Sequence, residues 1–347
     1  MPCSNALTEA DLAVFAPSAR PLRAPYNPSV NCYDNSKNRV ILGDAHEKSR
    51  SLADGSANLC VTAPPYYGML DYATQEWREG GEEGCKHKLG LVASEVLRAK
   101  SSGGEQRCMH CGVVLVMDKQ LGMEATQEEY EEKLVKVFHE VYRVLADDGA
   151  LFVTLGDSFD EDKNLRGIPW SVASKMRDDG WKLRNDIIWY KSNPKPEPVK
   201  DRFTRAHDYT FMFTKNGKYY YDYDAVREPA NSLTGGPIHG KHSVERGRQT
   251  SISTYDVNDG LRNPHTVQIA ATQPQANHPA ATPEKVVRPY IIAASRKGDV
   301  VLDPFAGSGT TLMVAKGLGR YYIGIELRPE HIKSIRARLE RQQAPLF

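Results

Sequence analysis

The residues best suited to chemistry form a glycine-rich turn near the C-terminal end, Asp303-Pro304-Phe305-Ala306-Gly307-Ser308-Gly309-Thr310-Thr311. The turn follows the apolar run 300–302 and leads into the helix-like stretch 312–315. A carboxylate at the end of a strand can bind a cationic group or hydroxyls, glycines let a ligand approach the backbone, and a helix start offers N–H groups. The pattern predicts a ligand site at a strand–turn–helix junction; the alternative is a turn with a purely structural role.

The residue order in this turn argues against a dinucleotide ligand. The spacing of Gly307 and Gly309 is not G-x-G-x-x-G, and the carboxylate of Asp303 would repel a diphosphate. A cationic adenosyl sulfonium fits better.

Two other predicted strands also end in carboxylates, at Asp44 and Glu326. Glu326 follows Asp303 by 23 residues, and an acid at about 20 residues beyond such a turn typically accepts hydrogen bonds from ribose hydroxyls.

A second candidate site lies far upstream, where Thr62-Ala63-Pro64-Pro65-Tyr66-Tyr67 follows the apolar strand 59–61. Two successive prolines fix the backbone and expose carbonyl oxygens, and Tyr66 offers a flat face on which a base can stack. An exocyclic base amine is a poor nucleophile, so it needs hydrogen-bond acceptors and an in-line methyl donor. The motif predicts an amine-holding clamp made of Ala63, Pro64, Pro65 and Tyr66; a rigid turn is the alternative.

Together the two motifs resemble those of the DNA amino-methyltransferases, which transfer a methyl group from S-adenosylmethionine to an exocyclic base nitrogen. The resemblance runs from about Arg39 to Leu339, and the catalytic motif precedes the cofactor turn, as in the permuted subgroup called beta. The resemblance places Asp44 near the adenine and Asp303 near the methionine portion of the cofactor. The cofactor-binding residues that we expect are Asp44, His278, Thr282, Asp303, Phe305, Gly307, Ser308, Gly309, Thr310, Thr311 and Glu326.

The segment from His278 to Pro283 is similar to a family segment that lies near the cofactor's carboxylate. Thr282 followed by Pro283 predicts a helix N-cap and first turn, and a helix start can hold an anion. The alternative is a capped helix with no ligand.

Ala63 departs from the family pattern, which usually has Asp, Asn or Ser at this position. An alanine cannot accept a hydrogen bond from the amine. The small residue, with Thr62 before it, favours cytosine-N4 over adenine-N6 as the target. Adenine-N6 and a degenerate, inactive copy are the alternatives.

Strands that alternate with helices predict an α/β fold with a doubly wound, mostly parallel sheet. The resemblance implies a Rossmann-like, circularly permuted class I methyltransferase, with strand 300–302 in the middle, strands 321–325 and 39–42 on one side, and 58–62 and 150–155 on the other. We also predict helices over 45–52, 168–176 and 283–294, the first of these short, and a helix from Thr126, with its capping box, to Asp148-Gly149. A hairpin of 208–214 and 218–223 is predicted about Asn216-Gly217.

The expected parts are an N-terminal arm 1–38, a catalytic half 39–72 and 123–224, a zinc-ribbon-like insertion 73–122, an irregular target-recognition region 225–277 and a cofactor half 278–347.

Basic residues with interleaved aromatics between Lys182 and Lys218 predict a DNA-facing surface. A stiff, proline-rich loop begins at Lys191, and the resemblance places it near the target base. An ordinary solvated loop is the alternative. The DNA-binding residues that we expect are Lys191, Asn193, Lys195, Arg202, Arg205, Lys241, Arg246, Arg248 and Arg262.

Four residues in the insertion have metal-ligand spacing: Cys85 and His87 form one close pair, and Cys108 and Cys111 form another. A full set of four such ligands suits a structural, tetrahedral zinc ion. Reduced surface cysteines are the alternative.

The composition fits a protein of a reducing cytoplasm. The chain has 347 residues, a net charge of +1 and six cysteines, and it lacks both a secretory signal and an apolar run of the roughly 18 residues that a membrane span needs. The resemblance, not the composition, implies a site-specific DNA methyltransferase of a bacterium or phage, acting in restriction–modification or as an orphan regulator. Double-stranded DNA is the expected partner, and the resemblance implies a homodimer. The rivals are an RNA or protein-amide methyltransferase and a non-catalytic DNA-binding module.

Overall fold

The computed structural model describes residues 37–68, 120–229, 261–273 and 282–342, and also 76–77, 85, 106–107, 110–111 and 114–116. The predicted N-terminal arm lies outside the described residues apart from 37–38. No helix of the described residues is long and apolar enough to cross a membrane.

The described part is built around an eight-stranded sheet with the order β1-β13-β12-β2-β6-β8-β7-β11. All strands run parallel except β8, which is antiparallel to both β6 and β7. In this order the strands are β1 (Arg39–Leu42), β13 (Tyr321–Glu326), β12 (Val300–Asp303), β2 (Ala57–Thr62), β6 (Leu145–Leu155), β8 (His207–Thr214), β7 (Lys182–Lys191) and β11 (Val267–Ala270).

The sheet confirms the predicted strand order around the glycine-rich turn. The strand that carries Asp303, β12, lies in the interior of the sheet, with β13 and β1 on one side and β2 and β6 on the other. Two smaller sheets are also described. One pairs β9 (Glu228–Pro229) with β10 (Leu261–Arg262), and the other has the order β3 (Glu76–Trp77), β5 (Val114–Val116) and β4 (Gln106–Arg107).

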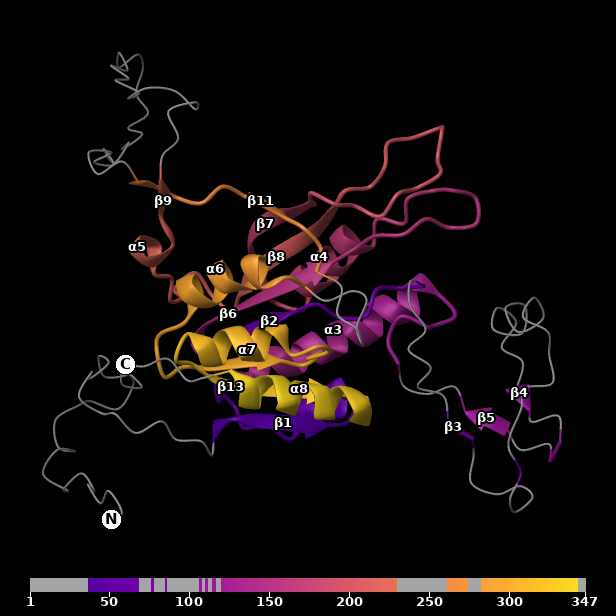
Figure 1. The fold of residues 1–347 in the computed structure, drawn as a ribbon, viewed down its shortest axis with the longest axis horizontal. Helices are drawn as coiled ribbons and strands as arrows, with labels where there is room; N and C mark the ends of the chain where they lie inside the picture. The colour runs from indigo at the N-terminus through magenta and orange to yellow at the C-terminus, as the bar shows by residue number, and fades with distance from the viewer. Residues whose placement is uncertain are drawn as a thin grey trace, which may run out of the picture. The chain divides into compact units, whose positions relative to one another are not determined.

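Helices cover both faces of the main sheet, which confirms the doubly wound prediction (Figure 1). On one face lie α6 (Glu284–Ala294), α7 (Thr310–Gly317) and α8 (Pro329–Arg341). On the other lie α1 (Ala45–Arg50), α3 (Gln127–Val144) and α4 (Ile168–Asp178). A short helix, α5 (Tyr223–Val226), packs against α6.

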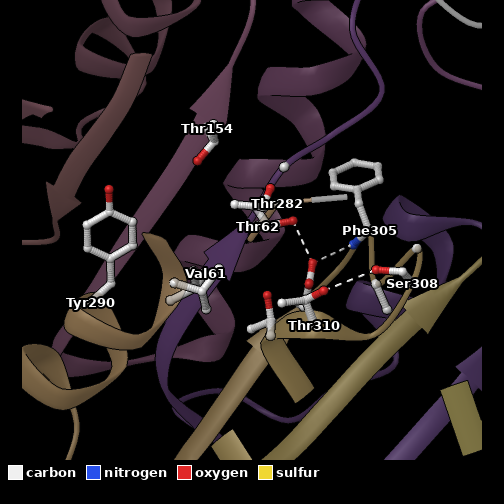
Figure 2. Close-up of a pocket in the computed structure, with 14 residues that line it drawn as sticks. Val61, Thr62, Thr154, Thr282, Tyr290, Phe305, Ser308 and Thr310 are labelled. Carbon is white, nitrogen blue, oxygen red and sulfur yellow. Dashed lines mark hydrogen bonds between the residues drawn. The ribbon is translucent and has the colours of Figure 1, made fainter. Parts of the chain in front are cut away.

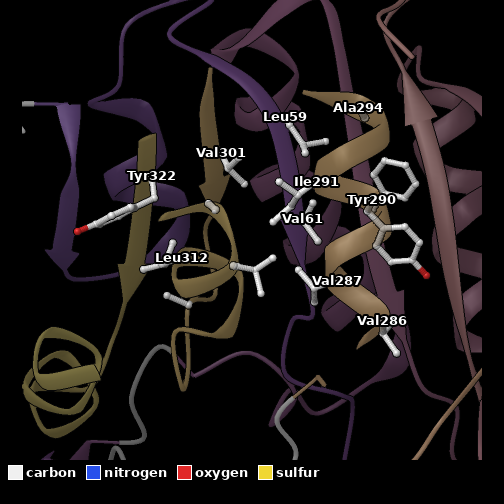
Figure 3. Packing of buried hydrophobic residues seen from close by; sticks show 14 of the residues in the cluster. Leu59, Val61, Val286, Val287, Tyr290, Ile291, Ala294, Val301, Leu312 and Tyr322 are labelled. Carbon is white, nitrogen blue, oxygen red and sulfur yellow. The ribbon is translucent and has the colours of Figure 1, made fainter. Parts of the chain in front are cut away.

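The core lies where β2 and β12 meet α6 and α7 (Figure 3). Every residue of these two strands is buried, because strands covered on both faces lose all contact with water. Leu59 and Val301 of the strands pack with Ile291 of α6 and Leu312 of α7. Full burial of such a side chain stabilises the fold by roughly 1.5–3 kcal/mol. The core therefore fixes the two strands from which the candidate motifs emerge.

Local signals located α3 correctly, although its end differs from the prediction. The Thr126 hydroxyl accepts a hydrogen bond from the Glu129 amide at 3.1 Å, as the capping box predicts. The helix ends at Val144 rather than at Asp148-Gly149, and β6 begins at once. Leu145 is already paired with Ala57 of β2, so tertiary pairing ends the helix early.

Two other predictions are wrong. The Asn216 turn forms, with its side-chain oxygen accepting from the Lys218 amide at 2.8 Å, but residues 218–222 do not form a strand. Both edges of β8 are already bonded to β6 and β7, so no edge remains for a hairpin partner. The region 225–277 is not irregular throughout, because β11 adds to the main sheet beside β7.

Candidate active site

The glycine-rich turn and Ala63 of the predicted clamp line one cavity at the carboxyl edge of the sheet (Figure 2). Pro64, Pro65 and Tyr66 are not among the residues that line it. Because β2, β6 and β12 are parallel, the residues that follow them come together at this edge. The cavity encloses about 440 Å³ of empty space including its open mouth. The predicted site residues that line it are Ala63, Thr282, Asp303, Phe305, Gly307, Ser308, Thr310 and Thr311.

A buried hydrogen bond joins the two motifs inside the cavity. The Thr62 hydroxyl donates to Asp303 Oδ1 at 2.7 Å, and the Phe305 amide donates to the same oxygen at 3.1 Å. Burial raises the pKa of Asp303 to about 6, although these hydrogen bonds oppose the shift. A cationic ligand group beside this carboxylate would favour its charged form. The cavity therefore has one end suited to a cation.

The glycine-rich turn passes close to the neighbouring elements. Gly307 and Gly309 have positive φ values of 51° and 79°, which favour glycine. A Cβ on Gly309 would also lie 3.1 Å from Ile335 of α8. The Gly307 amide donates to Glu326 Oε2 at 2.8 Å, so the next strand supports the turn.

The other two predicted acids do not line the cavity. Glu326 also accepts from the Arg328 amide at 3.0 Å and lies 3.2 Å from His331 Nδ1, and its side chain is buried. Asp44 is the N-cap of α1, where it accepts from the Glu47 amide at 2.9 Å. Both acids thus have structural partners within the chain.

Two helices begin beside the cavity without a side-chain cap. Gly309 is the N-cap of α7, and Pro283 is the N-cap of α6. The prediction that Thr282 caps α6 is wrong, because the helix starts one residue later and the Pro283 carbonyl accepts from Val286 at 3.0 Å. Uncapped first turns offer backbone N–H groups that suit an anion. With Asp303, they make the cavity complementary to a ligand that carries both charges, such as an amino acid.

The predicted clamp is held by residues that sequence analysis missed. The Tyr66 phenol donates to Asp208 Oδ2 at 3.1 Å, and Lys191 Nζ lies 2.8 Å from the same oxygen. The Tyr66 ring lies against the backbone of Gly156, where a Cβ would come within 2.4 Å of Cε2. Asp208 stands within a predicted strand, and its burial could not be inferred from that pattern. The ring and its hydroxyl are therefore both fixed.

The two proline carbonyls of the clamp differ in whether they accept a hydrogen bond within the protein. The Pro65 carbonyl accepts a hydrogen bond from the buried Tyr130 hydroxyl at 2.9 Å. No hydrogen bond to the Pro64 carbonyl is found within the described ranges. We expected both carbonyls to be available as acceptors for a substrate amine, but only the Pro64 carbonyl remains available. The helical spacing that located Tyr130 on α3 gave no sign of this contact.

Most of the predicted DNA-facing residues that the structure describes contact the protein itself. Asn193 Oδ1 accepts from the Thr272 amide at 2.6 Å. Arg202 pairs with Glu197 at 2.7 Å and lies over the Phe159 ring at 4.0 Å, and Arg262 pairs with Glu228 at 2.9 Å. Arg205 has a buried guanidinium nitrogen without a hydrogen-bond partner, and Lys195 is exposed.

Several predicted residues lie outside the described part of the chain: Lys241, Arg246, Arg248, His278, His87 and Cys108. Cys85 and Cys111 are described, and both are partly buried. Within the described residues there is no group of three or more side chains that could hold a metal ion. Zinc stays a prediction of the sequence.

Comparison with known proteins identifies the family. A family model described as DNA methylase matches residues 57–337. The chain belongs to this DNA methylase family. It is 34% identical to the Type II methyltransferase M.XycI of Xanthomonas campestris pv. cyanopsidis, covering 88% of each chain, and 34% identical to M.Cfr9I of Citrobacter freundii, covering 84% of each. The methylase is 31% identical to M.SmaI of Serratia marcescens, covering 88% of this chain and 91% of that relative.

Solved structures agree on the fold. PvuII DNA methyltransferase, described as cytosine-N4-specific, superposes with a TM-score of 0.57 at 19% identity, covering 87% of this chain and 86% of its own. TTHA0409, a DNA modification methylase of Thermus thermophilus, was solved in complex with S-adenosyl-L-methionine. It superposes with a TM-score of 0.52 at 23% identity, covering 89% of this chain and 97% of its own. The methylase thus has a class I methyltransferase fold, and it is an S-adenosylmethionine-dependent, Type II DNA amino-methyltransferase.

The contact between Gly156 and Tyr66 gives a test of the site geometry. We expect Gly156→Ala to lower the free energy of unfolding by about 1–3 kcal/mol, because its methyl group would overlap the Tyr66 ring. In a Tyr66→Ala background the same substitution should cost nothing. Chemical denaturation of the four proteins measures this coupling; an equal cost in both backgrounds would contradict the contact.

Proposed function

We propose that the methylase transfers a methyl group from S-adenosylmethionine to the exocyclic amine of a base flipped out of duplex DNA, and that cytosine-N4 is the target. The observation that carries this proposal is the shared cavity, where Ala63 of the clamp and Gly307 of the glycine-rich turn face the same space. A methyl donor and an acceptor amine can meet only if their sites adjoin, because positioning supplies much of the rate.

The cofactor end of the cavity is the part around Asp303. The buried carboxylate would bind the cationic part of the donor, and the uncapped starts of α6 and α7 would face its carboxylate. Val61 and Phe305 add apolar walls. When bound, S-adenosylmethionine supplies an electrophilic methyl group on a sulfonium. We keep Glu326 and Asp44 as proposed contacts for its ribose and adenine, although neither lines the cavity.

The base end of the cavity is the part around Ala63. Tyr66, fixed by Asp208 and Gly156, would offer its ring to a base that has left the duplex. The Pro64 carbonyl would accept a hydrogen bond from the amine. The small residue Ala63, with Thr62 before it, supports cytosine-N4 as the target; adenine-N6 is the second candidate.

The remaining sequence interpretations stand as parts of this proposal. The order of the motifs corresponds to a circularly permuted member of the family, and the segment about 191–205 faces DNA. Lys195 is exposed there, and the paired arginines would exchange an internal carboxylate for a phosphate on binding. Zinc in the insertion rests on the spacing of its cysteine and histidine residues, and a homodimer rests on the sequence resemblance.

The target base is tested by methylating duplex DNA in vitro and analysing its nucleosides by mass spectrometry. We expect N4-methylcytosine from the wild-type methylase, and loss of methyl transfer in Tyr66→Ala with little change in the affinity for S-adenosylmethionine. N6-methyladenine would identify the second candidate. Methylation of RNA but not of DNA, or full activity of Tyr66→Ala, would contradict the proposal.

The raised pKa of Asp303 predicts a pH dependence of cofactor binding. Below about pH 6 the carboxyl group is protonated and neutral, and above it the carboxylate can attract a cation. The dissociation constant for S-adenosylmethionine should therefore fall about tenfold from pH 5 to pH 7, as the ionised fraction rises. Calorimetric titration measures this change. Asp303→Asn should bind weakly with no such slope; an equal slope in that variant would assign the titration to another group.

A further inference from the structure

Ala63 gives the amine end of the cavity no side-chain acceptor, because a methyl group cannot accept a hydrogen bond. The cavity wall next to it contains a hydroxyl. Residues Thr62 and Val153 are register partners in the parallel pair of β2 and β6, so the next residues, Ala63 and Thr154, are neighbours across the two strands. Both line the cavity. Thr154 stands with Tyr290 on one side of the cavity, opposite Phe305 and Thr310 of the glycine-rich turn (Figure 2).

Thr154 is held by a neighbour in the sheet. Its Oγ1 lies 2.9 Å from Thr210 Oγ1 on β8. The other hydroxyl on this side of the cavity is the Tyr290 phenol of α6, which has a partner of its own. The Tyr290 hydroxyl donates to Gln268 Oε1 of β11 at 3.0 Å. Thr154, Thr210 and Tyr290 are all buried.

The bond to Thr210 leaves Thr154 Oγ1 able to accept a hydrogen bond. A threonine hydroxyl has one proton and two lone pairs, and either oxygen of the pair can be the donor. In either direction, at least one lone pair of Thr154 Oγ1 stays available to the cavity. Thr154 therefore offers an acceptor next to the position where Ala63 has none.

The other hydroxyls of the cavity are bonded elsewhere or lie on other elements. Thr62 donates to Asp303, Ser308 Oγ lies 3.1 Å from Thr310 Oγ1, and Tyr290 donates to Gln268. Thr311 lies in α7 and Thr282 precedes α6, so neither follows β2 or β6. Thr154 is thus the hydroxyl of the cavity that the strand register brings beside Ala63.

We propose that Thr154 is a catalytic residue that accepts a hydrogen bond from the target amine, in place of a side chain at position 63. This inference rests on the proposed amine methylation. With one N–H directed to Thr154 and the other to the Pro64 carbonyl, the nitrogen lone pair turns out of the base plane toward the methyl group. The C–N bond forms as the C–S bond breaks, the sulfur keeps the electron pair, and the extra amine proton passes to water at the cavity mouth.

The test replaces the hydroxyl with a methyl group of the same shape. We expect Thr154→Val to lower the single-turnover rate of methyl transfer on the order of 100-fold, with the affinities for S-adenosylmethionine and DNA unchanged. Thr154→Ser keeps a hydroxyl and should keep most of the rate. Thr214→Val, which removes a buried hydroxyl bonded to the Asn216 carbonyl at the far end of β8, should leave the rate unchanged.

A second variant separates catalysis from packing. Ala63→Ser places a hydroxyl beside the one that is lost, so the double variant Ala63→Ser/Thr154→Val should recover at least about tenfold of the lost rate. A structural defect at Thr154 would not be repaired in this way. Wild-type rate in Thr154→Val, or a double variant as slow as the single one, overturns the role of Thr154. A wild-type protein that methylates no base in DNA would instead overturn the proposed function itself.

Discussion

The hydrogen bond from Thr62 to Asp303 is the contact on which the active site depends. The two residues are far apart in the chain, yet their oxygens lie 2.7 Å apart in the buried interior. They meet because β2 and β12 are parallel neighbours in the sheet and end at the same edge. Since Thr62 immediately precedes the clamp and Asp303 opens the glycine-rich turn, this bond fixes the distance between the two halves of the site.

Around this contact, contacts within the protein already hold the groups of the site before any ligand binds. Asp208 and Gly156 hold Tyr66, Glu326 holds Gly307, and Tyr130 holds the Pro65 carbonyl. Groups that are already oriented need little rearrangement when the substrates bind, which is how enzymes lower a barrier through electrostatics and position. Asp303 differs from these groups, because its charge is not fully stabilised by the protein. Burial raises its pKa, so that a bound ligand is needed to stabilise the carboxylate.

Sequence patterns predicted the parts of this arrangement that depend on local chemistry. Apolar runs located β2 and β12, and the glycine-rich motif located the turn, because each signal lies within a few adjacent residues. Only the resemblance to a family gave the strand order, since pairing in a sheet is not local. The predicted Asn216 hairpin failed for the same reason: its turn forms, but the neighbours of β8 were decided elsewhere in the sheet.

Contacts between distant side chains could not be predicted. Asp208 and Tyr66 are 142 residues apart, and Gln268, Tyr290, Thr210 and Thr154 come from four different elements. In the sequence, Thr154 is one polar residue in a strong strand, and nothing marks it as part of a cavity. Such roles follow from register and burial, which only the folded structure supplies.

Hydrogen exchange measured by mass spectrometry tests most directly whether the clamp and the glycine-rich turn share one cavity. On addition of S-adenosylmethionine, we expect slower amide exchange both in the turn, 304–309, and in the clamp segment, 63–68, because one ligand would close the space between them. Protection of the turn alone, with exchange over 63–68 unchanged, would contradict the account.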